Sequence, residues 1–428
     1  MHVLTAAFLV ALACGTGLRL WLASRQMTAV RSHRNAVPEP FSTEIPLAAH
    51  TKAADYTIAR TRLAAWELLV DAAVVLALTL GGGIAAIDAA WRRTHWHEPW
   101  LGTLVVLTVL AVSALVGLPF SIWRTFRIEA RFGFNRSTAA LFWIDRLKGL
   151  GIALALGIPL LAGALLLMTR TGPWWWLYAW GAWLAVSVVL TWAWPAFIAP
   201  LFNRFVPLGD ADLRARIDSL LARCGFASKG VFVVDSSRRT AHGNAYFTGI
   251  GRNKRIVFFD TLLEQLGAPE IEAVLAHELG HFRLRHVRQR LVLSAAGSLA
   301  GLAALGTLYR EPWFYADLGV PIASAHCALI LFLLVAPVFL FFVTPLGAAW
   351  SRRHEFAADR FAASNASAQD LAHALVKLYR DNATTLTPDR ITSAFYDSHP
   401  PALSRIERLR ALASPESAGG HPPHPDLL

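Results

Sequence analysis

The sequence is poor in charged residues and in cysteine. Of its 428 residues only 16% are charged and 55% are hydrophobic, whereas soluble globular domains carry about 25% charged residues. The three cysteines, Cys14, Cys224 and Cys327, lie far apart and none forms a C-x-x-C pair. This pattern excludes a disulfide framework and a thiolate metal site. Any metal in this protein must therefore be held by histidine and carboxylate side chains.

Long apolar stretches are what the sequence has in abundance. A membrane-spanning helix needs about 20 apolar residues, and seven segments reach that length: 2–23, 66–90, 101–123, 149–169, 174–200, 289–308 and 325–349. The first has no basic segment before it and contains Arg19, so we interpret it as a membrane helix and not as a signal peptide. The ionisable residues inside these spans include Glu67, Asp71, Asp88 and His326. Such residues usually face a helix-bundle interior or a wet cavity, although Glu67 and Asp88 are equally compatible with helix ends at the interface.

The basic residues predict an orientation in the membrane. The chain holds 40 Lys and Arg against 29 Asp and Glu, a net charge of +11. These residues fall mostly between the apolar stretches, where they act as topology signals and lipid anchors and not as nucleic-acid contacts. The loops 24–65 and 124–148 carry six each, while the loops on the opposite side carry four in all. The positive-inside rule then predicts these cytoplasmic segments, with the N-terminus outside: 24–65, 124–148, 201–288 and 350–428.

The polar segments divide the chain into parts. The pattern of residues 201–288 predicts a helix from Asp210 to Cys224, followed by the short strands GVFVVD, NAYFTGI and RIVFFD. The segment GRNK between the last two strands predicts a hairpin turn. The tail from Ser414 is rich in Pro, Gly and Ser, which predicts disorder. We expect five parts: a membrane region 1–200 with five helices, a catalytic part 201–288, two membrane helices in 289–349, a second catalytic part 350–412 and a disordered tail 413–428.

The stretch AVLAHELGHFRLRH, residues 273–286, places His277 and His281 four residues apart. Helical spacing stacks the two imidazoles on one face, where they can bind one Zn²⁺ ion. Glu278 lies beside them, where it can accept a proton from the attacking water. Gly280 costs about 1 kcal/mol against Ala in a helix interior. A close approach of backbone or substrate would explain this glycine.

A catalytic zinc ion needs a third protein ligand and one open position. The segment SRRHEFAADRFA carries Glu355 and Asp359 one helical turn apart. Glu355 can complete a His₂Glu set, and Asp359 then faces the same site, where it can accept the free N–H of a ligand histidine or pass protons. The alternative is an amphipathic helix with a solvated acidic face. His354 points elsewhere on the helical wheel, and we interpret it, with His242 and His286, as a surface or packing residue.

The sequence resembles the type 1 CAAX prenyl protease family, integral-membrane zinc metallopeptidases related to the bacterial heat-shock protease HtpX. The resemblance extends beyond HELGH and EFAAD to four more stretches in the family's order: His50–Leu63, Leu118–Asn135, Gly243–Leu263 and Ser398–Leu409. It covers nearly the whole chain except the tail. The N-terminal stretches are specific, because HtpX-like relatives are shorter and lack them.

This resemblance implies roles for the residues of the metal site. It makes His277, His281 and Glu355 the zinc ligands and Glu278 the general base. Asp359 corresponds to an acidic residue that supports the ligands or donates a proton.

The resemblance also implies residues that meet the substrate. Asn244 and Ala245 fall in an edge strand that pairs with substrate backbone. His399 and Arg405 correspond to a histidine and an arginine that lean over the site, stabilise the oxyanion and order the carboxylates. From the residues alone, SHPP is a loop and the next segment a surface helix. Only the resemblance gives His399 a role.

The fold class that follows is mainly α: a multi-pass membrane protein of about seven helices around a polar chamber, plus a small α+β zincin-like catalytic domain with a short β-sheet. We expect a zinc endopeptidase with one zinc ion per chain. Its partners are a protein or peptide substrate, with prenylation left open, and the lipid bilayer. We expect no nucleic acid and a monomeric chain.

Two other function classes compete with this prediction. A zinc-stabilised binding or quality-control protein without turnover would have no need of the base Glu278. A transporter would show two matching Gly/Pro-broken segments in opposite halves, which are absent from the sequence.

Overall fold

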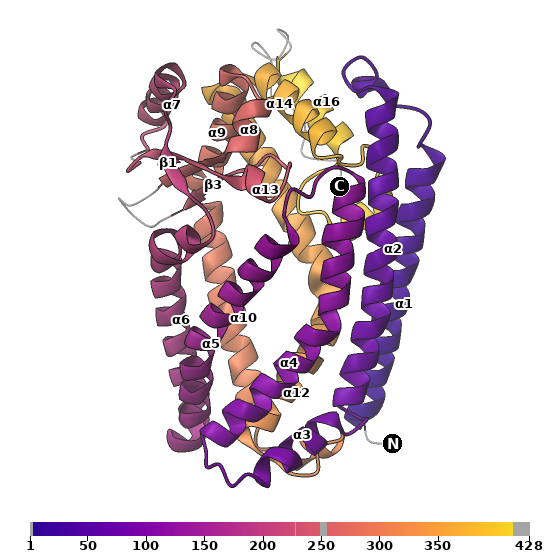
Figure 1. Ribbon diagram of the computed structural model, residues 1–428, viewed down its shortest axis with the longest axis vertical. Coiled ribbons are helices and arrows are strands. Elements are labelled where there is room, and N and C mark those ends of the chain that lie inside the picture. The colour runs from indigo at the N-terminus through magenta and orange to yellow at the C-terminus, as the bar shows by residue number, and fades with distance from the viewer. Residues whose placement is uncertain (1–2, 227, 249–254, 414–428) are drawn as a thin grey trace.

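The computed structural model describes residues 3–226, 228–248 and 255–413 of the chain. Long helices run along its longest axis, and the sheet and most of the shorter helices gather at one end, while the short helix α3 lies at the other (Figure 1). The long helices and the short helix α3 are α1 Val3–Ser32, α2 Leu47–Leu78, α3 Gly83–Arg92, α4 Trp100–Trp123, α5 Ala139–Arg170, α6 Trp175–Ala193, α10 His286–Leu308 and α12 Ala325–Leu340. Six helical segments of the described chain are long and apolar enough to span a membrane, and a bent pair makes a seventh. The fold class predicted from the sequence is confirmed.

The segment predicted as the second span, 66–90, is not one continuous helix. Helix α2 ends at Leu78, and α3 starts at Gly83 after a bend of 52°. Gly82 lies in the break with φ +76°, a left-handed conformation that glycine adopts without steric cost. Helix α2 also begins at Leu47, well before the predicted span, and packs along α1. The prediction of an apolar membrane span here was right, but the span is broken into two helices and is not one continuous helix.

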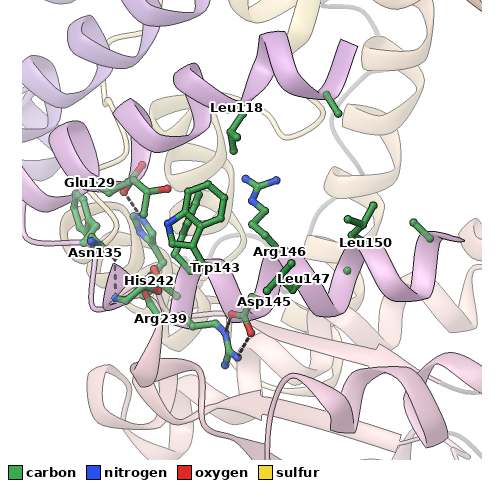
Figure 2. A pocket seen from close by; sticks show the side chains of 18 of the residues that line it. Leu118, Glu129, Asn135, Trp143, Asp145, Arg146, Leu147, Leu150, Arg239 and His242 are labelled. Atoms are coloured by element: carbon green, nitrogen blue, oxygen red, sulfur yellow. Dashed lines mark hydrogen bonds and ion pairs between the residues drawn. The ribbon is translucent and has the colours of Figure 1, made fainter. Parts of the chain in front are cut away.

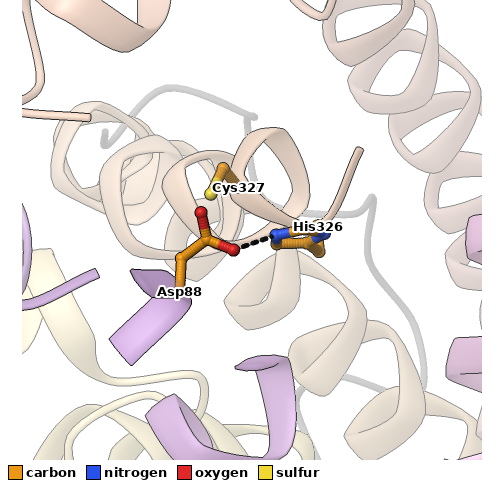
Figure 3. A group of neighbouring side chains, drawn as sticks. All are labelled: Asp88, His326 and Cys327. Atoms are coloured by element: carbon orange, nitrogen blue, oxygen red, sulfur yellow. Dashed lines mark hydrogen bonds and ion pairs between the residues drawn. The ribbon is translucent and has the colours of Figure 1, made fainter. Parts of the chain in front are cut away.

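Two of the ionisable residues inside the spans, Asp88 and His326, form a polar contact at the end of the molecule far from the sheet. Asp88 on α3 lies beside His326 and Cys327 on α12, and all three are buried (Figure 3). The Nε2 atom of His326 lies 2.9 Å from the Asp88 carboxylate, and its Nδ1 atom lies 3.0 Å from the Glu98 carboxylate. The second oxygen of Asp88 accepts a hydrogen bond from Arg92 at 2.8 Å. The carboxylate of Asp88 and the imidazole of His326 are therefore already paired with neighbouring groups. We interpret the cluster as a polar contact between α3 and α12 and not as a metal site.

A four-stranded mixed sheet lies at the opposite end. Its strands are β1 Phe205–Pro207, β2 Val231–Val234, β3 Ala245–Thr248 and β4 Arg255–Phe259, in the order β1-β2-β4-β3. β2 and β4 are parallel, and β3 pairs antiparallel with β4, with Ala245 opposite Phe258. The predicted pairing of the last two strands is confirmed, while the GRNK turn lies outside the described residues. The sequence analysis missed β1, because a three-residue edge strand ending in proline gives no alternating pattern.

Helices pack around this sheet and enclose an apolar core. They are α7 Ala211–Arg223, α8 Asp260–Gln265, α9 Ala268–Arg283, α13 Thr344–Asn365, α14 Ala368–Asp381, α15 Arg390–Tyr396 and α16 Ala402–Ala413, while the short α11 Pro312–Ala316 lies between the last two spans. Ile217, Phe258, Leu275 and Ile406 are among the buried residues of this core. Helix α13 follows α12 after one short turn, so the predicted boundary at 349/350 falls inside a helix. The tail from Ser414 lies outside the described residues.

Candidate metal centre

Helices α9 and α13 pack against each other and bring three potential metal ligands together. The Nε2 atoms of His277 and His281 are 3.3 Å apart. They lie 3.5 Å and 3.4 Å from the two carboxylate oxygens of Glu355. Tetrahedral zinc with bonds of about 2.0–2.1 Å separates neighbouring donor atoms by roughly 3.3 Å. The three side chains therefore fit such an ion without rearrangement.

The two candidate histidine ligands differ in protonation. Burial and the nearby Arg405 oppose protonation of His277, but its hydrogen bonds to Asp359 and Glu355 raise its pKa. Burial and the neighbouring His277 lower the pKa of His281 to about 4, so its ring is neutral at neutral pH. Glu278 follows His277 and is half-buried, and burial raises its pKa above the usual glutamate value. A carboxylate with a raised pKa is a stronger base, as proton abstraction from water requires.

Gly280 allows the two helices to come this close. A β-carbon at this position would lie 3.1 Å from the Ala358 Cα atom and 3.2 Å from the Phe361 Cβ atom. These contacts are tighter than ordinary van der Waals separations, and two of the neighbouring atoms belong to the α13 backbone. The close backbone approach expected from this glycine is observed, and it occurs between helices α9 and α13.

Gly280→Ala should therefore weaken metal binding without removing a ligand. The added methyl group pushes α13 from α9 by a few tenths of an ångström and moves Glu355 away from the histidines, although alanine favours the helix by about 1 kcal/mol. The measurement is the zinc dissociation constant by chelator competition. Gly297→Ala on α10, where a β-carbon meets nothing within 4 Å, is the matched control. Equal zinc affinity in Gly280→Ala and wild type would contradict the role given to this glycine.

A buried ion pair supports the outer side of His277. Its Nδ1 atom lies 2.8 Å from the Asp359 carboxylate. Arg405 on α16 donates two hydrogen bonds to the same carboxylate, at 2.8 Å from Nε and 2.7 Å from Nη2. Arg405 is only 5% exposed. The structure thus brings Arg405 to Asp359 and His277, behind the ligands, and not to an open face where it could contact substrate.

His399 comes to the site from the segment before α16. Its Nδ1 atom lies 2.7 Å from a Glu355 oxygen, and its side chain is 65% exposed. Because Nδ1 contacts Glu355, contact with a substrate oxyanion would use Nε2.

Asn244 and Ala245 lie at the start of β3, the edge strand of the sheet. The Ala245 N–H bonds to the Asn244 side-chain oxygen at 2.8 Å, and the Asn244 carbonyl accepts from Phe259 N at 3.0 Å. The side of β3 away from β4 has no strand partner among the described residues. The edge-strand position expected for these two residues is thus observed.

A cavity of about 1060 Å³ lies between α4, α5 and the chain that leads into β3 (Figure 2). Leu118 on α4 and Leu150 on α5 line its apolar part, and Arg146 projects into it. Glu129 and His242 lie at its polar end, with a carboxylate–imidazole distance of 3.6 Å. The chain that lines the cavity at His242 reaches Asn244, at the start of the edge strand, two residues later.

The three histidines interpreted as surface or packing residues all pack inside the protein. His242 stacks on Phe134 with ring centroids 4.3 Å apart. His286 and His354 are buried and stack on each other at 3.9 Å. His286 also lies 3.1 Å from the candidate ligand His281, a contact that was not predicted from the sequence. The third histidine in HELGHFRLRH was the only signal, and helical periodicity could not place it because α9 ends before it.

Comparisons with known proteins agree with this fold and site. Residues 26–204 match the family model of the CAAX prenyl protease N-terminal region with five membrane helices, and residues 207–413 match peptidase family M48. The chain is 40% identical to the CAAX prenyl protease 1 homolog of Arabidopsis thaliana over 71% of each chain. It is 30% identical to the human CAAX prenyl protease 1 homolog over 83% of this chain and 85% of that one. The crystal structure of S. mikatae Ste24p superposes with a TM-score of 0.87 at 27% identity, covering 96% of this chain and 99% of that one.

Membrane-spanning helices joined to an HExxH helix and a carboxylate from a second helix define a multi-pass membrane metallopeptidase. The matches cover both the membrane region and the catalytic region. The chain belongs to peptidase family M48, in the group of the CAAX prenyl protease 1 homologues. The family resemblance seen in the sequence is confirmed. A protein without turnover is correspondingly disfavoured.

Proposed function

We propose that the protein is a zinc endopeptidase that cleaves peptide bonds near the C-terminus of lipid-modified proteins. The observation that carries the metal assignment is the spacing of 3.3–3.5 Å between the donor atoms of His277, His281 and Glu355. Two imidazoles, one carboxylate and an open position form the ligand set of a catalytic zinc site.

Glu278 acts as the general base beside this ligand set. A bound zinc ion supplies a Lewis acid that acidifies water and polarises the scissile carbonyl. Glu278 takes the proton from the attacking water and returns it to the leaving amine. Its half-buried position and raised pKa suit both steps.

The surrounding side chains hold the ligands and the reacting groups. Asp359 accepts the Nδ1–H of His277 and so directs Nε2 to the metal. Arg405 keeps Asp359 in place through two hydrogen bonds. His399 orients Glu355 through Nδ1 and can donate from Nε2 to the oxyanion, with Asn244 as a second donor.

The edge strand and the cavity support a lipid-modified peptide as substrate. An extended peptide can add to β3 beside Asn244 and Ala245 through backbone hydrogen bonds. The cavity adjoining this strand has apolar residues from two membrane helices, which suit a hydrocarbon chain. The names of the curated relatives, CAAX prenyl proteases, indicate a prenyl group as this chain.

A cleavage assay with matched peptides tests this function. We expect about one zinc ion per purified chain, and hydrolysis of a peptide that ends in a prenylated cysteine and three further residues. The same peptide without the prenyl group is the control, and the expected difference is a higher KM. Removal of zinc should abolish hydrolysis and its return should restore it. Hydrolysis that survives complete metal removal would refute the zinc mechanism, and equal KM values would refute the lipid preference.

We further propose that the sheet and the metal centre lie on the cytoplasmic side of the membrane and that the chain acts as a monomer without nucleic acid. The loops with six basic residues each support this orientation. A cysteine in place of exposed Glu407 on α16, with the three native cysteines replaced by serine, should react with an impermeant thiol reagent only after cell lysis. A cysteine in place of exposed His97 should react in intact cells. The reverse labelling pattern would overturn the orientation.

A further inference from the structure

The two histidine ligands have different partners on their outer nitrogens. His277 Nδ1 lies 2.8 Å from the Asp359 carboxylate, which Arg405 holds in place. His281 Nδ1 instead lies 3.1 Å from Nδ1 of His286. Metal-ligating histidines almost always donate the N–H of their other ring nitrogen to an acceptor, which fixes the ring orientation. The nitrogen of His286 occupies the place of that acceptor.

The tautomers follow from the metal chemistry. When His281 gives its Nε2 lone pair to a metal, its proton is on Nδ1, which can only donate. His286 Nδ1 must then be the acceptor, and His286 carries its own proton on Nε2. We infer that His286 is a positioning residue that holds His281 in its metal-binding tautomer and orientation; this inference rests on the proposed function of the site.

The backbone between the two histidines is shaped for this contact. Helix α9 ends at Arg283 and α10 begins at His286, with only two residues between them. Arg285 in this turn has φ +61°, a left-handed conformation that is unfavourable for a non-glycine residue. This turn starts α10 at once and brings the His286 ring back toward His281.

A stack of aromatic rings holds His286 from its other side. The rings of His286 and His354 are 3.9 Å apart and nearly parallel, at 6°. Trp350 on the same helix packs against His354 with ring centroids 4.4 Å apart. His354 directly precedes the ligand Glu355, so the stack connects the start of α10 to the helix that carries the third ligand. Hydrogen bonding and stacking at His286 are separate functions of one ring and can be separated by substitution.

Three variants separate these functions. His286→Phe keeps a flat ring against His354 and removes the acceptor, so zinc affinity should fall by about 10–100-fold, the range typical for partners behind metal ligands. His286→Asn places an amide oxygen near the position of Nδ1 and should restore most of that loss. His354→Phe keeps the stack and leaves the acceptor intact, so its zinc affinity should equal that of wild type. His373→Leu, on the exposed face of α14, is the control for the loss of a histidine elsewhere.

The measurement is the zinc dissociation constant of the full-length purified protein by chelator competition, with kcat and KM on the same samples. The expected result is that His286→Phe alone loses affinity and that kcat falls more than KM changes. Wild-type affinity in His286→Phe would overturn the inference, as would equal losses in the Phe and Asn variants, which would mean that an acceptor at this position does not restore zinc affinity. These outcomes are distinct from failure of the proposed function, in which wild type itself would bind no stoichiometric zinc.

Discussion

Glu278→Gln is expected to lose peptide hydrolysis while the protein keeps its metal. The amide has the size of the carboxylate, so the ligands on either side of it, His277 and His281, remain in place. It cannot accept a proton from water, and general base catalysis contributes typically 10²–10⁴-fold to a rate. We therefore expect kcat to fall by at least about 100-fold.

Zinc content and activity must be measured on the same sample for this test. A Glu278→Gln protein with wild-type zinc and wild-type kcat would remove Glu278 from the base role. A protein with neither zinc nor activity would show that Glu278 supports the metal site itself. Glu264→Gln on α8, outside the metal site, is the matched control for the change of charge.

Glu355→Ala is expected to cause the largest loss of metal among single substitutions on α13. Glu355 approaches both histidine nitrogens, at 3.5 and 3.4 Å, and supplies the only anionic donor of the set. Its removal leaves two neutral ligands, and zinc affinity should fall by more than the roughly 10–100-fold loss that a residue behind the ligands causes. The measurement is zinc per chain after dialysis against a chelator of defined affinity.

Asp359→Asn is the comparison variant for this prediction. Alanine at this position would leave the guanidinium of Arg405 buried without its partner, which costs about 3–5 kcal/mol, whereas asparagine keeps the shape and one acceptor oxygen. This variant should retain more zinc than Glu355→Ala under the same dialysis. Full zinc occupancy in Glu355→Ala would mean that another side chain is the third ligand.

The parts of the candidate metal centre that lie within a single helix were predictable from the sequence. The spacing of His277 and His281 fixes both rings on one face of a helix, because the helix repeats every 3.6 residues. The spacing of Glu355 and Asp359 does the same on α13. That the two helices meet could not be derived from either segment alone. The need for a third ligand suggested this pairing, the family resemblance agreed with it, and Gly280 was the one local sign of a close approach.

Other features depended on contacts between distant segments. The burial of Arg405 behind Asp359 results from the docking of α16, and an isolated helix with several charges predicts a surface position. The contact of His286 with His281 depends on a left-handed residue, Arg285, which no sequence rule assigns to arginine. The break between α2 and α3 was different, because Gly81, Gly82 and Gly83 were a readable signal that the hydrophobicity pattern obscured.

The division of the ligand set between α9 and α13 has a consequence for how the protein is made. His281 and Glu355 are 74 positions apart, and the membrane helices α10 and α12 lie between them. During synthesis the two histidines are complete long before the carboxylate, and they meet it only after both helices have entered the bilayer as a hairpin. A chain whose insertion is unfinished therefore lacks its anionic ligand. If Glu355 is the third ligand, as proposed, the ligand set is complete only once the chain has been synthesised through α12 into α13.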